Sequence, residues 1–593
     1  MIFYRLFIIL GVFCLFGTGA SAPSYSREPT PARESSDQIA PESATGIQET
    51  KAVQGKQFMV ATAHPLATQA GFDILSRGGT AADAAIAVQL VLGLVEPQSS
   101  GIGGGGFVLY YDAKTGKLTS FDGRETAPRL AGRHMFIGED GKPLPFYKAA
   151  VGARAVGVPG IPALMETLHK SHGRLPWRDL FSPAITLAET GFAVSPRLSA
   201  LAQADRQRLK HHVDTQLYFM PDSSTPLPEG HWLQNGLYAQ TLRDMALNGT
   251  QSFYKGEIAQ KISRIVQDDT RNPGLITPED MAAYRVKERA PVCGAYRAYK
   301  ICSMGEPSSG GLTLLSALGI LNHFDLPSWG PDNVMSWHVI GEASRLAFAD
   351  RNYYMADSDF VKTPGINLID PAYLAARAKL ISGDKVISDV LPGTPPGWVE
   401  ETPTSADRSV TPPGTTHISI VDGYGNIVSM TSSIENAFGS RLMVDGFLLN
   451  NQLTDFSFEP DHQGKRVANH VQGGKRPRSS MTPVIVFDSA NKPILVIGSA
   501  GGSAIIGYVL SRIISILDWH MDVNTALRVS NVIHRGTGFE MEDTASAMGD
   551  QLNAKGHPVE YKDLNSGLTA IDLRSGLYTG AVDPRREGTA KGY

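Results

Sequence analysis

The sequence lacks a long run of basic residues, and its net charge is −4 with an isoelectric point of about 6.4. Nucleic acid is therefore not an expected partner. Its 15 histidines show no spacing typical of metal ligands, so no metal or other cofactor is expected. No internal repeat is apparent, and beyond the first residues no hydrophobic stretch is long enough to span a membrane.

What the chain does contain begins with a signal-like N-terminus. Arg5 is followed by an uncharged apolar run, 6–16, and then by small residues up to Ala22. We expect residues 1–22 to be a cleaved signal peptide and the protein to be exported, either to the periplasm or outside the cell. Residues 23–50 are rich in Ser, Pro, Glu and Thr, which predicts a disordered linker. The mature protein is then expected to be soluble, without a stable membrane span.

Two cysteines remain once Cys14 leaves with the signal peptide. Cys293 and Cys302 flank the octapeptide GAYRAYKI, a pattern that predicts a hairpin with the cysteines on facing strands. An oxidising compartment allows such a pair to form a disulfide, and this is the interpretation we favour. Two free, packed thiols are the alternative.

The chain from about residue 51 alternates helical and extended patterns. Thr277-Pro278 marks a helix start within a mainly helical middle part, and residues 386–414 predict a loop rich in Pro, Thr and Ser. This distribution predicts two layers of sheet flanked by helices. The expected strands are 58–61, 107–111, 416–421, 427–433, 442–449, 482–487 and 493–498, and the expected helical stretches include 65–77, 81–95, 330–385 and 503–518.

A glycine-rich stretch, 101–106, could be mistaken for a phosphate-binding loop. Such loops lie between a strand and a following helix, whose N-terminus receives the phosphate. Here the order is helix, glycines, strand, so the pattern favours close packing of backbone against backbone over nucleotide binding.

Thr415 ends the Pro-rich loop and opens a strand in which Ile418 and Ile420 alternate with polar residues. A threonine hydroxyl becomes an effective nucleophile when a cut before it frees its own α-amine to serve as the base. A free α-amine has a pKa of about 7.7–8, which suits general-base catalysis near neutral pH. Thr415 is therefore either such a nucleophile or simply the β-branched start of a strand.

Several motifs in a fixed order resemble those of the γ-glutamyltransferases (glutathione hydrolases), a family of the N-terminal-nucleophile hydrolase superfamily. The similarity covers roughly residues 55–593. The matching stretches are GGTAADAAIAV, GGGGFVLYY, FDGRETAP, PSSGG, GTTHISIVD, LLNNQLTDF, KRPRSSMTP, GSAGGS and DPRREGTAKGY.

This resemblance implies an α/β (α+β) fold, an αββα sandwich formed by two subunits from one precursor. Autocatalytic cleavage between Gly414 and Thr415 would give a large subunit, 51–414, and a small catalytic subunit, 415–593, which stay together as a heterodimer. The implied reaction forms a γ-glutamyl ester on Thr415 from glutathione or another γ-glutamyl compound. Water, an amino acid or a peptide then accepts the acyl group.

The resemblance also assigns site residues by motif. Gly501 and Gly502 match the oxyanion-hole pair, and Ser433 matches the hydroxyl that orients the nucleophile, with Thr416 as a second helper. The residues matched to the substrate α-carboxylate are Arg124, Ser479 and Ser480, and those matched to its α-ammonium are Glu435, Gln452 and Asp455.

Two departures from the family pattern bear on substrate preference. The segment after Asp455, SFEPDHQGKRVANHVQGG, has no tyrosine, whereas some relatives carry a tyrosine-bearing lid there, so closure of such a lid is not expected. Arg478 stands where leucine is common. Three alternatives stay open: an acylase that removes glutaryl side chains from cephalosporin-type β-lactam precursors, a non-catalytic relative that does not mature, and a nucleotide-binding protein.

Overall fold

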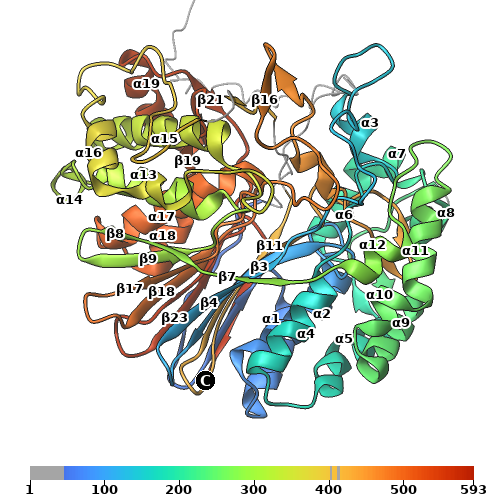
Figure 1. Ribbon diagram of the computed structural model, residues 1–593. Coiled ribbons are helices and arrows are strands. Elements are labelled where there is room, and N and C mark those ends of the chain that lie inside the picture. The colour runs from blue at the N-terminus through green and yellow to red at the C-terminus, as the bar shows by residue number, and fades with distance from the viewer. Residues whose placement is uncertain (1–45, 223, 401–403, 410–413) are drawn as a thin grey trace, which may run out of the picture. The chain divides into compact units, whose positions relative to one another are not determined.

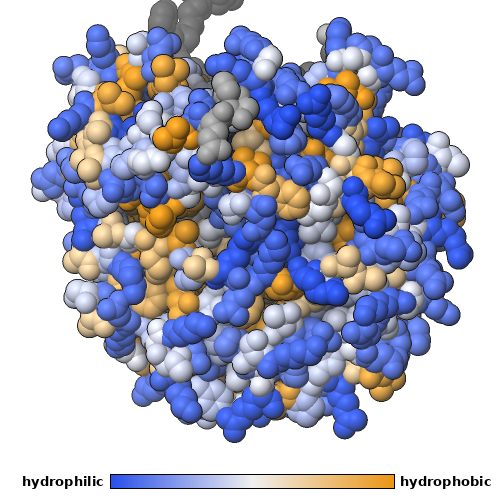
Figure 2. Space-filling view, viewed as in Figure 1, coloured by the Kyte–Doolittle hydropathy of each residue, from blue (hydrophilic) through white to orange (hydrophobic). Residues whose placement is uncertain are grey.

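The computed structural model describes residues 46–593 except 223, 401–403 and 410–413. The predicted signal peptide and most of the predicted linker lie outside the described residues. Within them, no helix combines the length and the apolar character needed to cross a bilayer. The face seen in Figure 2 is mainly hydrophilic, and its hydrophobic residues occur in small groups.

Two seven-stranded antiparallel sheets form the centre of the fold (Figure 1). The first contains, in spatial order, β24 (Thr589–Gly592), β2 (Met59–Thr62), β11 (Thr416–Val421), β12 (Ile427–Ser433), β3 (Gly105–Asp112), β4 (Lys117–Gly123) and β7 (Lys287–Arg289). The second contains β1 (Val53–Gly55), β23 (Tyr578–Val582), β22 (Thr569–Asp572), β18 (Pro493–Gly498), β17 (Val484–Phe487), β9 (Tyr299–Ser303) and β8 (Val292–Tyr296). Each sheet therefore mixes strands from before and after Thr415.

Helices cover the outer face of each sheet (Figure 1). Helices α1 (Pro65–Ser76), α2 (Ala81–Val95) and α4 (Ile161–His172) lie on the first sheet, with α5 (Ser182–Thr190), α9 (Gly236–Asn248) and α11 (Glu257–Gln267) in the same half. Helices α13 (Gly310–Leu321) and α17 (Ile505–Leu517) lie on the second sheet, and α15 (Val334–Tyr354) packs on α13. The predicted αββα sandwich is confirmed.

Burial on both faces explains the composition of the central strand β11. Ile418 and Ile420 belong to the core beneath the first helical layer, whereas Val421 belongs to the core between the sheets. Ser419 hydrogen-bonds Thr569 of the second sheet, with 3.0 Å between the hydroxyl oxygens. The polar residues of the predicted alternation therefore face the other sheet.

Most predicted elements are present with small shifts at their ends, but one expectation was wrong. The strand predicted at 442–449 is a hairpin of β13 (Met443–Val444) and β14 (Phe447–Leu448), because Asp445 and Gly446 turn the chain with φ of 44° and 89°. The segment 330–385 is mostly helical, as predicted, and consists of α15, a 3-10 turn (Gly365–Ile369) and α16 (Pro371–Ala378) joined by short connections. The patterns also missed β4 and the C-terminal strands β22, β23 and β24.

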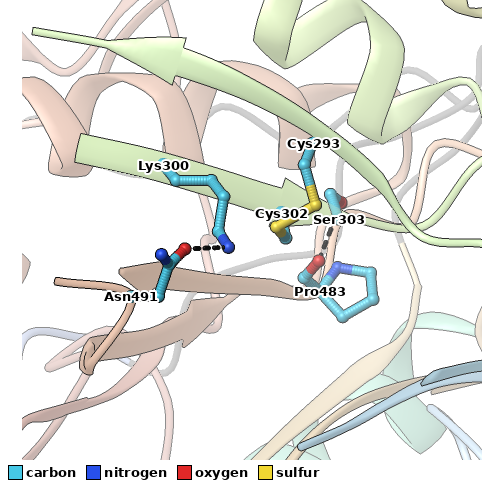
Figure 3. The surroundings of a disulfide bond; sticks show 6 residues. All are labelled: Cys293, Lys300, Cys302, Ser303, Pro483 and Asn491. Carbon is cyan, nitrogen blue, oxygen red and sulfur yellow. Dashed lines mark hydrogen bonds between the residues drawn. A yellow bond between two sulfur atoms is a disulfide. The ribbon is translucent and has the colours of Figure 1, made fainter. Parts of the chain in front are cut away.

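The predicted cysteine hairpin is present at the edge of the second sheet (Figure 3). Cys293 of β8 and Cys302 of β9 are paired in register and joined by a disulfide. Ser303 Oγ donates a hydrogen bond to the Pro483 carbonyl at 2.7 Å, which ties the hairpin to the chain just before β17. The disulfide interpretation is confirmed over the alternative of two free thiols.

Candidate functional site

Thr415 lies buried at the N-terminal end of β11 with φ of 107°. A positive φ is unfavourable for a β-branched residue and costs about 1–3 kcal/mol. Its Oγ1 donates to Ser433 Oγ, 3.2 Å away at the end of β12, and Ser433 Oγ also accepts from the Glu435 N–H at 2.7 Å. The Thr415 carbonyl accepts from Arg586 Nη1 at 2.9 Å. The predicted pair of Thr415 and Ser433 is thus in contact, in a strained backbone.

The peptide link before Thr415 meets the glycine pair. The Gly501 N–H donates to the Gly414 carbonyl at 3.3 Å, and Gly501 and Gly502 have φ of 127° and 57°, which glycine adopts most readily. These two glycines lead through a 3-10 turn (Gly502–Ala504) into α17. A backbone donor therefore faces the carbonyl of the link that the sequence predicts to be cut.

Close backbone approach surrounds this link. A Cβ on Gly414 would lie 1.6 Å from the Glu435 carbonyl oxygen, so no larger residue fits there. A Cβ on Gly104 would lie 2.1 Å from the carbonyl oxygen of Ser433. The glycine-rich stretch therefore packs its backbone against the end of β12, which confirms the packing interpretation of 101–106.

Arg124, the residue matched to the substrate carboxylate, is fully buried. Its Nη2 forms an ion pair with Asp455, the residue matched to the ammonium, and its Nε donates to the Pro477 carbonyl at 3.2 Å. Its Nη1 has no hydrogen-bond partner among the described residues and lies 3.7 Å from Glu125 Oε2. Burial raises the pKa of Glu125 to about 8. One donor of Arg124 thus stays free.

The serine pair follows directly on the Pro477–Arg478 backbone that Arg124 contacts. Ser479 Oγ accepts from the Met481 N–H at 3.1 Å, and Ser480 Oγ accepts from Arg351 Nη2 at 2.8 Å. Among the described residues neither hydroxyl donates a hydrogen bond. Both hydroxyl protons are therefore without an acceptor among the described residues, on the segment whose preceding carbonyls Arg124 contacts.

The three residues matched to the ammonium have the opposite character. Gln452 and Asp455 lie in a 3-10 turn (Gln452–Asp455), where Gln452 Nε2 donates to Asp455 Oδ2 at 2.8 Å. Asp455 Oδ1, Gln452 Oε1 and both carboxyl oxygens of Glu435 lack a hydrogen-bond partner in the described part of the chain. Burial, and then the charge of Asp455, raise the pKa of Glu435 well above its ordinary value. Glu435, Gln452 and Asp455 therefore carry buried acceptor oxygens that have no hydrogen-bond partner among the described residues.

The segment after Asp455 forms a small sheet with the loop that precedes Thr415. Strands β15 (Asp461–His462) and β16 (Lys465–Val467) form a hairpin, and β16 pairs with β10 (Thr404–Ser405). Asp407 accepts from Arg478 Nη2 at 2.8 Å and from Asn469 Nδ2 at 3.0 Å. The unusual Arg478 thus anchors this loop, which explains its charge beside the serine pair.

Sequence reasoning gave no role to Arg351 or Asn469, because their contacts arise only when distant segments pack together. Arg586 lay within the quoted motif DPRREGTAKGY and could have been singled out there. As for metals, no group of three or more His, Cys, Asp or Glu side chains among the described residues is arranged to hold an ion.

A buried threonine that begins a central strand of an αββα sandwich and faces a backbone N–H donor is the arrangement of the N-terminal-nucleophile hydrolases. The family model for gamma-glutamyltranspeptidase matches residues 67–593. The chain belongs to the gamma-glutamyltranspeptidase family of enzymes, as its motifs predicted.

Individual relatives agree with this membership. Over 556 residues the chain is 38% identical to a glutathione hydrolase proenzyme of Bacillus subtilis (strain 168), covering 91% of this chain and 92% of the relative. The glutathione hydrolase proenzyme of Escherichia coli (strain K12) is 36% identical over 562 residues, which cover 92% and 94%. Among solved structures, a cephalosporin acylase from Bacillus halodurans superposes with a TM-score of 0.79 at 28% identity, covering 94% of this chain and 99% of that one.

Proposed function

We propose that the chain is a glutathione hydrolase proenzyme that cuts itself before Thr415 and then transfers γ-glutamyl groups to water, amino acids or peptides. One observation carries the substrate assignment. Free donors on Arg124, Ser479 and Ser480 suit a carboxylate, and free acceptors on Glu435, Gln452 and Asp455 suit an ammonium. Buried polar groups are normally paired, so such a set is the complement of a zwitterionic amino-acid head group.

The first reaction is the cut itself. Thr415 Oγ1 attacks the Gly414 carbonyl carbon, and the C–N bond breaks as the acyl group passes from nitrogen to oxygen. The Gly501 N–H lies 3.3 Å from the carbonyl oxygen on which charge develops, and Ser433 Oγ lies 3.2 Å from the attacking hydroxyl. The freed amine takes up the hydroxyl proton, and the strained φ of Thr415 is released in this step because its N-terminal link is gone. Water then hydrolyses the ester, which leaves a carboxylate on Gly414 and restores the Thr415 hydroxyl.

The second reaction reuses the same hydroxyl. The new α-amine of Thr415 takes the hydroxyl proton, and Oγ1 attacks the γ-amide carbon of the substrate. Gly501 and Gly502 supply backbone donors to the oxyanion, and the leaving amine departs with a proton. Water or an amine then attacks the γ-glutamyl ester and frees Thr415.

The two parts of the cut chain would remain together as a heterodimer. Both seven-stranded sheets mix strands from before and after Thr415, so separation would expose the cores on both faces of each sheet. Export is proposed from the signal-like N-terminus, and the Cys293–Cys302 disulfide supports an oxidising compartment.

A denaturing gel and N-terminal sequencing of the smaller fragment test this proposal. Wild type should give two bands, the smaller beginning at Thr415, and should release p-nitroaniline from γ-glutamyl-p-nitroanilide. Thr415→Ala should give one band and no turnover, whereas the control Thr404→Ala, in the same loop, should behave as wild type. Full activity in an uncut chain would overturn the mechanism.

A second candidate, a glutaryl or cephalosporin acylase, is favoured by the superposition on the Bacillus halodurans acylase. A glutaryl group keeps the carboxylate but lacks the ammonium, so it would leave the free acceptors of Glu435, Gln452 and Asp455 unmatched. We therefore expect a higher kcat/KM for the γ-glutamyl anilide than for the glutaryl anilide. The reverse order would favour the acylase.

A further inference from the structure

Three buried arginines lie around the serine pair, and they differ in their partners. Arg124 pairs with Asp455, and Arg478 pairs with Asp407. Arg351, at the end of α15, forms no ion pair within the described residues and hydrogen-bonds only neutral groups. Arg351 is therefore a buried cation without a direct ion pair among the described residues, and only the more distant carboxylates of Asp407 and Asp455 attract it.

Two of the three hydrogen bonds that the Arg351 guanidinium donates lead to the serine pair or its support, and the third goes from Nη1 to Asn352 Oδ1 at 2.8 Å. Nη2 donates to Ser480 Oγ at 2.8 Å, and Nε donates to Ser309 Oγ at 2.9 Å. Ser309 in turn donates its N–H and its Oγ–H to the Ser479 carbonyl, at 2.8 and 2.7 Å. The Arg351 guanidinium thus contacts Ser480 directly and Ser479 through Ser309.

The electrostatic environment of Arg351 favours the binding of an anion at the serine pair. Burial, and then the charge of Arg478, lower the pKa of Arg351 well below its ordinary value, and the charges of Asp407 and Asp455 offset this only in part, so the charged form of Arg351 carries a desolvation cost. An anion bound to the serine hydroxyls would offset that cost, because Ser480 accepts from Arg351 and keeps its own proton free to donate. The charge of Arg124, by contrast, is already balanced by Asp455.

We infer that Arg351 is a positioning residue that orients the Ser479–Ser480 pair and supplies the net positive charge for the substrate α-carboxylate. This inference rests on the proposed function. Arg351 does not touch the substrate; it acts through Ser480, whose O–H it directs and polarises.

Substrates that lack one charged group separate this role from a structural one. Glutaryl-p-nitroanilide keeps the carboxylate and lacks the ammonium, whereas 4-aminobutanoyl-p-nitroanilide keeps the ammonium and lacks the carboxylate. Arg351→Gln should raise KM about 10- to 100-fold for the γ-glutamyl and glutaryl anilides, the factor for one lost hydrogen bond to a charged group. Its kcat should stay within about threefold, and kcat/KM for the 4-aminobutanoyl anilide should match wild type.

Arg351→Lys keeps the charge without the planar fork and should restore part of the KM. Arg345→Gln, on the same helix but paired with Glu342, is the matched control and should leave KM unchanged. In a Ser480→Ala background, Arg351→Lys should have little further effect, because the two residues act through one contact.

Each contrary result has a distinct meaning. An equal loss on the 4-aminobutanoyl anilide, or an unchanged KM on the γ-glutamyl anilide, would overturn the role of Arg351. Uncut single bands from both Arg351 variants, with Arg345→Gln cut normally, would assign the residue to maturation and also overturn it. Absence of γ-glutamyl turnover in wild type would instead overturn the proposed function.

Discussion

The two ends of the site are built on different physical principles. The nucleophile end, formed by Thr415, Ser433 and Gly501, is built from hydroxyls and backbone amides, with Arg586 bound to the Thr415 carbonyl, and it is held by close approach and a strained φ. The recognition end, formed by Arg124, Glu435, Asp455, Ser480 and Arg351, is crowded with buried charge and with free donors and acceptors.

Because of this difference, the two ends should be sensitive to different kinds of substitution. At the nucleophile end geometry matters, since a shift of about 1 Å in a reacting atom can cost about 100-fold in rate. At the recognition end charge matters, and a substitution there should change which substrate is accepted. Substitutions at the nucleophile end should therefore change the rate of cleavage or turnover, and substitutions at the recognition end should change the relative kcat/KM of different substrates.

The largest effect is expected from Gly414→Ala. The added Cβ would lie 1.6 Å from the Glu435 carbonyl oxygen, so the link before Thr415 must move. We expect self-cleavage to slow by at least about 100-fold, followed on denaturing gels over time.

Gly423→Ala is its matched control, in the turn that follows β11. The nearest heavy atom to a Cβ there is the Gln57 carbonyl oxygen at 4.0 Å, so cleavage should be normal. Equal cleavage rates in the two variants would show that close packing does not position the link.

Asp455→Asn should break the recognition end without moving the nucleophile. It removes the charge proposed to bind the substrate ammonium and frees Arg124 from its ion pair. We expect kcat/KM for γ-glutamyl-p-nitroanilide to fall about 100-fold, and that for the glutaryl anilide to fall far less. The exposed Asp461→Asn is the control; a uniform loss on both substrates would contradict separate recognition of the ammonium.

At the recognition end, the titration of Glu435 should make the free energy of unfolding depend on pH. Its pKa is raised in the folded protein, so the native state keeps a proton that the unfolded chain loses. Its contribution to stability is therefore complete below the unfolded pKa and falls as pH rises, by up to about 1.4 kcal/mol per pH unit. In an uncut Thr415→Ala background, Glu435→Gln should gain stability relative to Glu435 between pH 5 and 8 in urea titrations; parallel curves would contradict this.

His417, two residues after Thr415, should show a pH dependence of stability with the opposite sign. Burial lowers its pKa to about 3, so the native state stays neutral while the unfolded chain takes up a proton below about pH 6.5. Stability is then complete above that pH and falls as pH decreases toward 3, again by up to about 1.4 kcal/mol per unit. His417→Gln should flatten the acid limb of the stability curve, and exposed His323→Gln should not.

Sequence patterns predicted the sandwich, the cysteine hairpin and strands β11, β12 and β18, because burial on one or both faces leaves a strong periodic or continuous apolar signal. They failed at 442–449, where Asp445-Gly446, a pair typical of tight hairpin turns, was overlooked; both residues adopt a positive φ and divide the apolar run into two strands. The apolar signal is also weak in β24, which is only half-buried.

The candidate residues came from motifs, and the structure joins some of them in pairs, Thr415 with Ser433 and Asp455 with Arg124 and Gln452, but their other partners were not predictable. Arg351 and Ser480 are 129 positions apart, and Arg478 and Asp407 are 71 apart. Such pairs depend on how helices and loops pack on the sheets. The free donors and acceptors likewise become visible only when every other hydrogen bond is accounted for.

The smallest effect on turnover is expected from removing the disulfide. Cys293 and Cys302 lie at the edge of the second sheet, whereas Thr415 and Ser433 lie in the centre of the first. The double variant Cys293→Ser/Cys302→Ser should lose about 2–3 kcal/mol of stability, the chain-entropy value for so short a loop, seen as a lower Tm. Because β9 continues into the loop that carries Ser309, KM is the sensitive readout. A KM unchanged within about twofold would show that hydrogen bonds alone hold the recognition end. A marked rise in KM would show that the geometry of the recognition end depends on the disulfide.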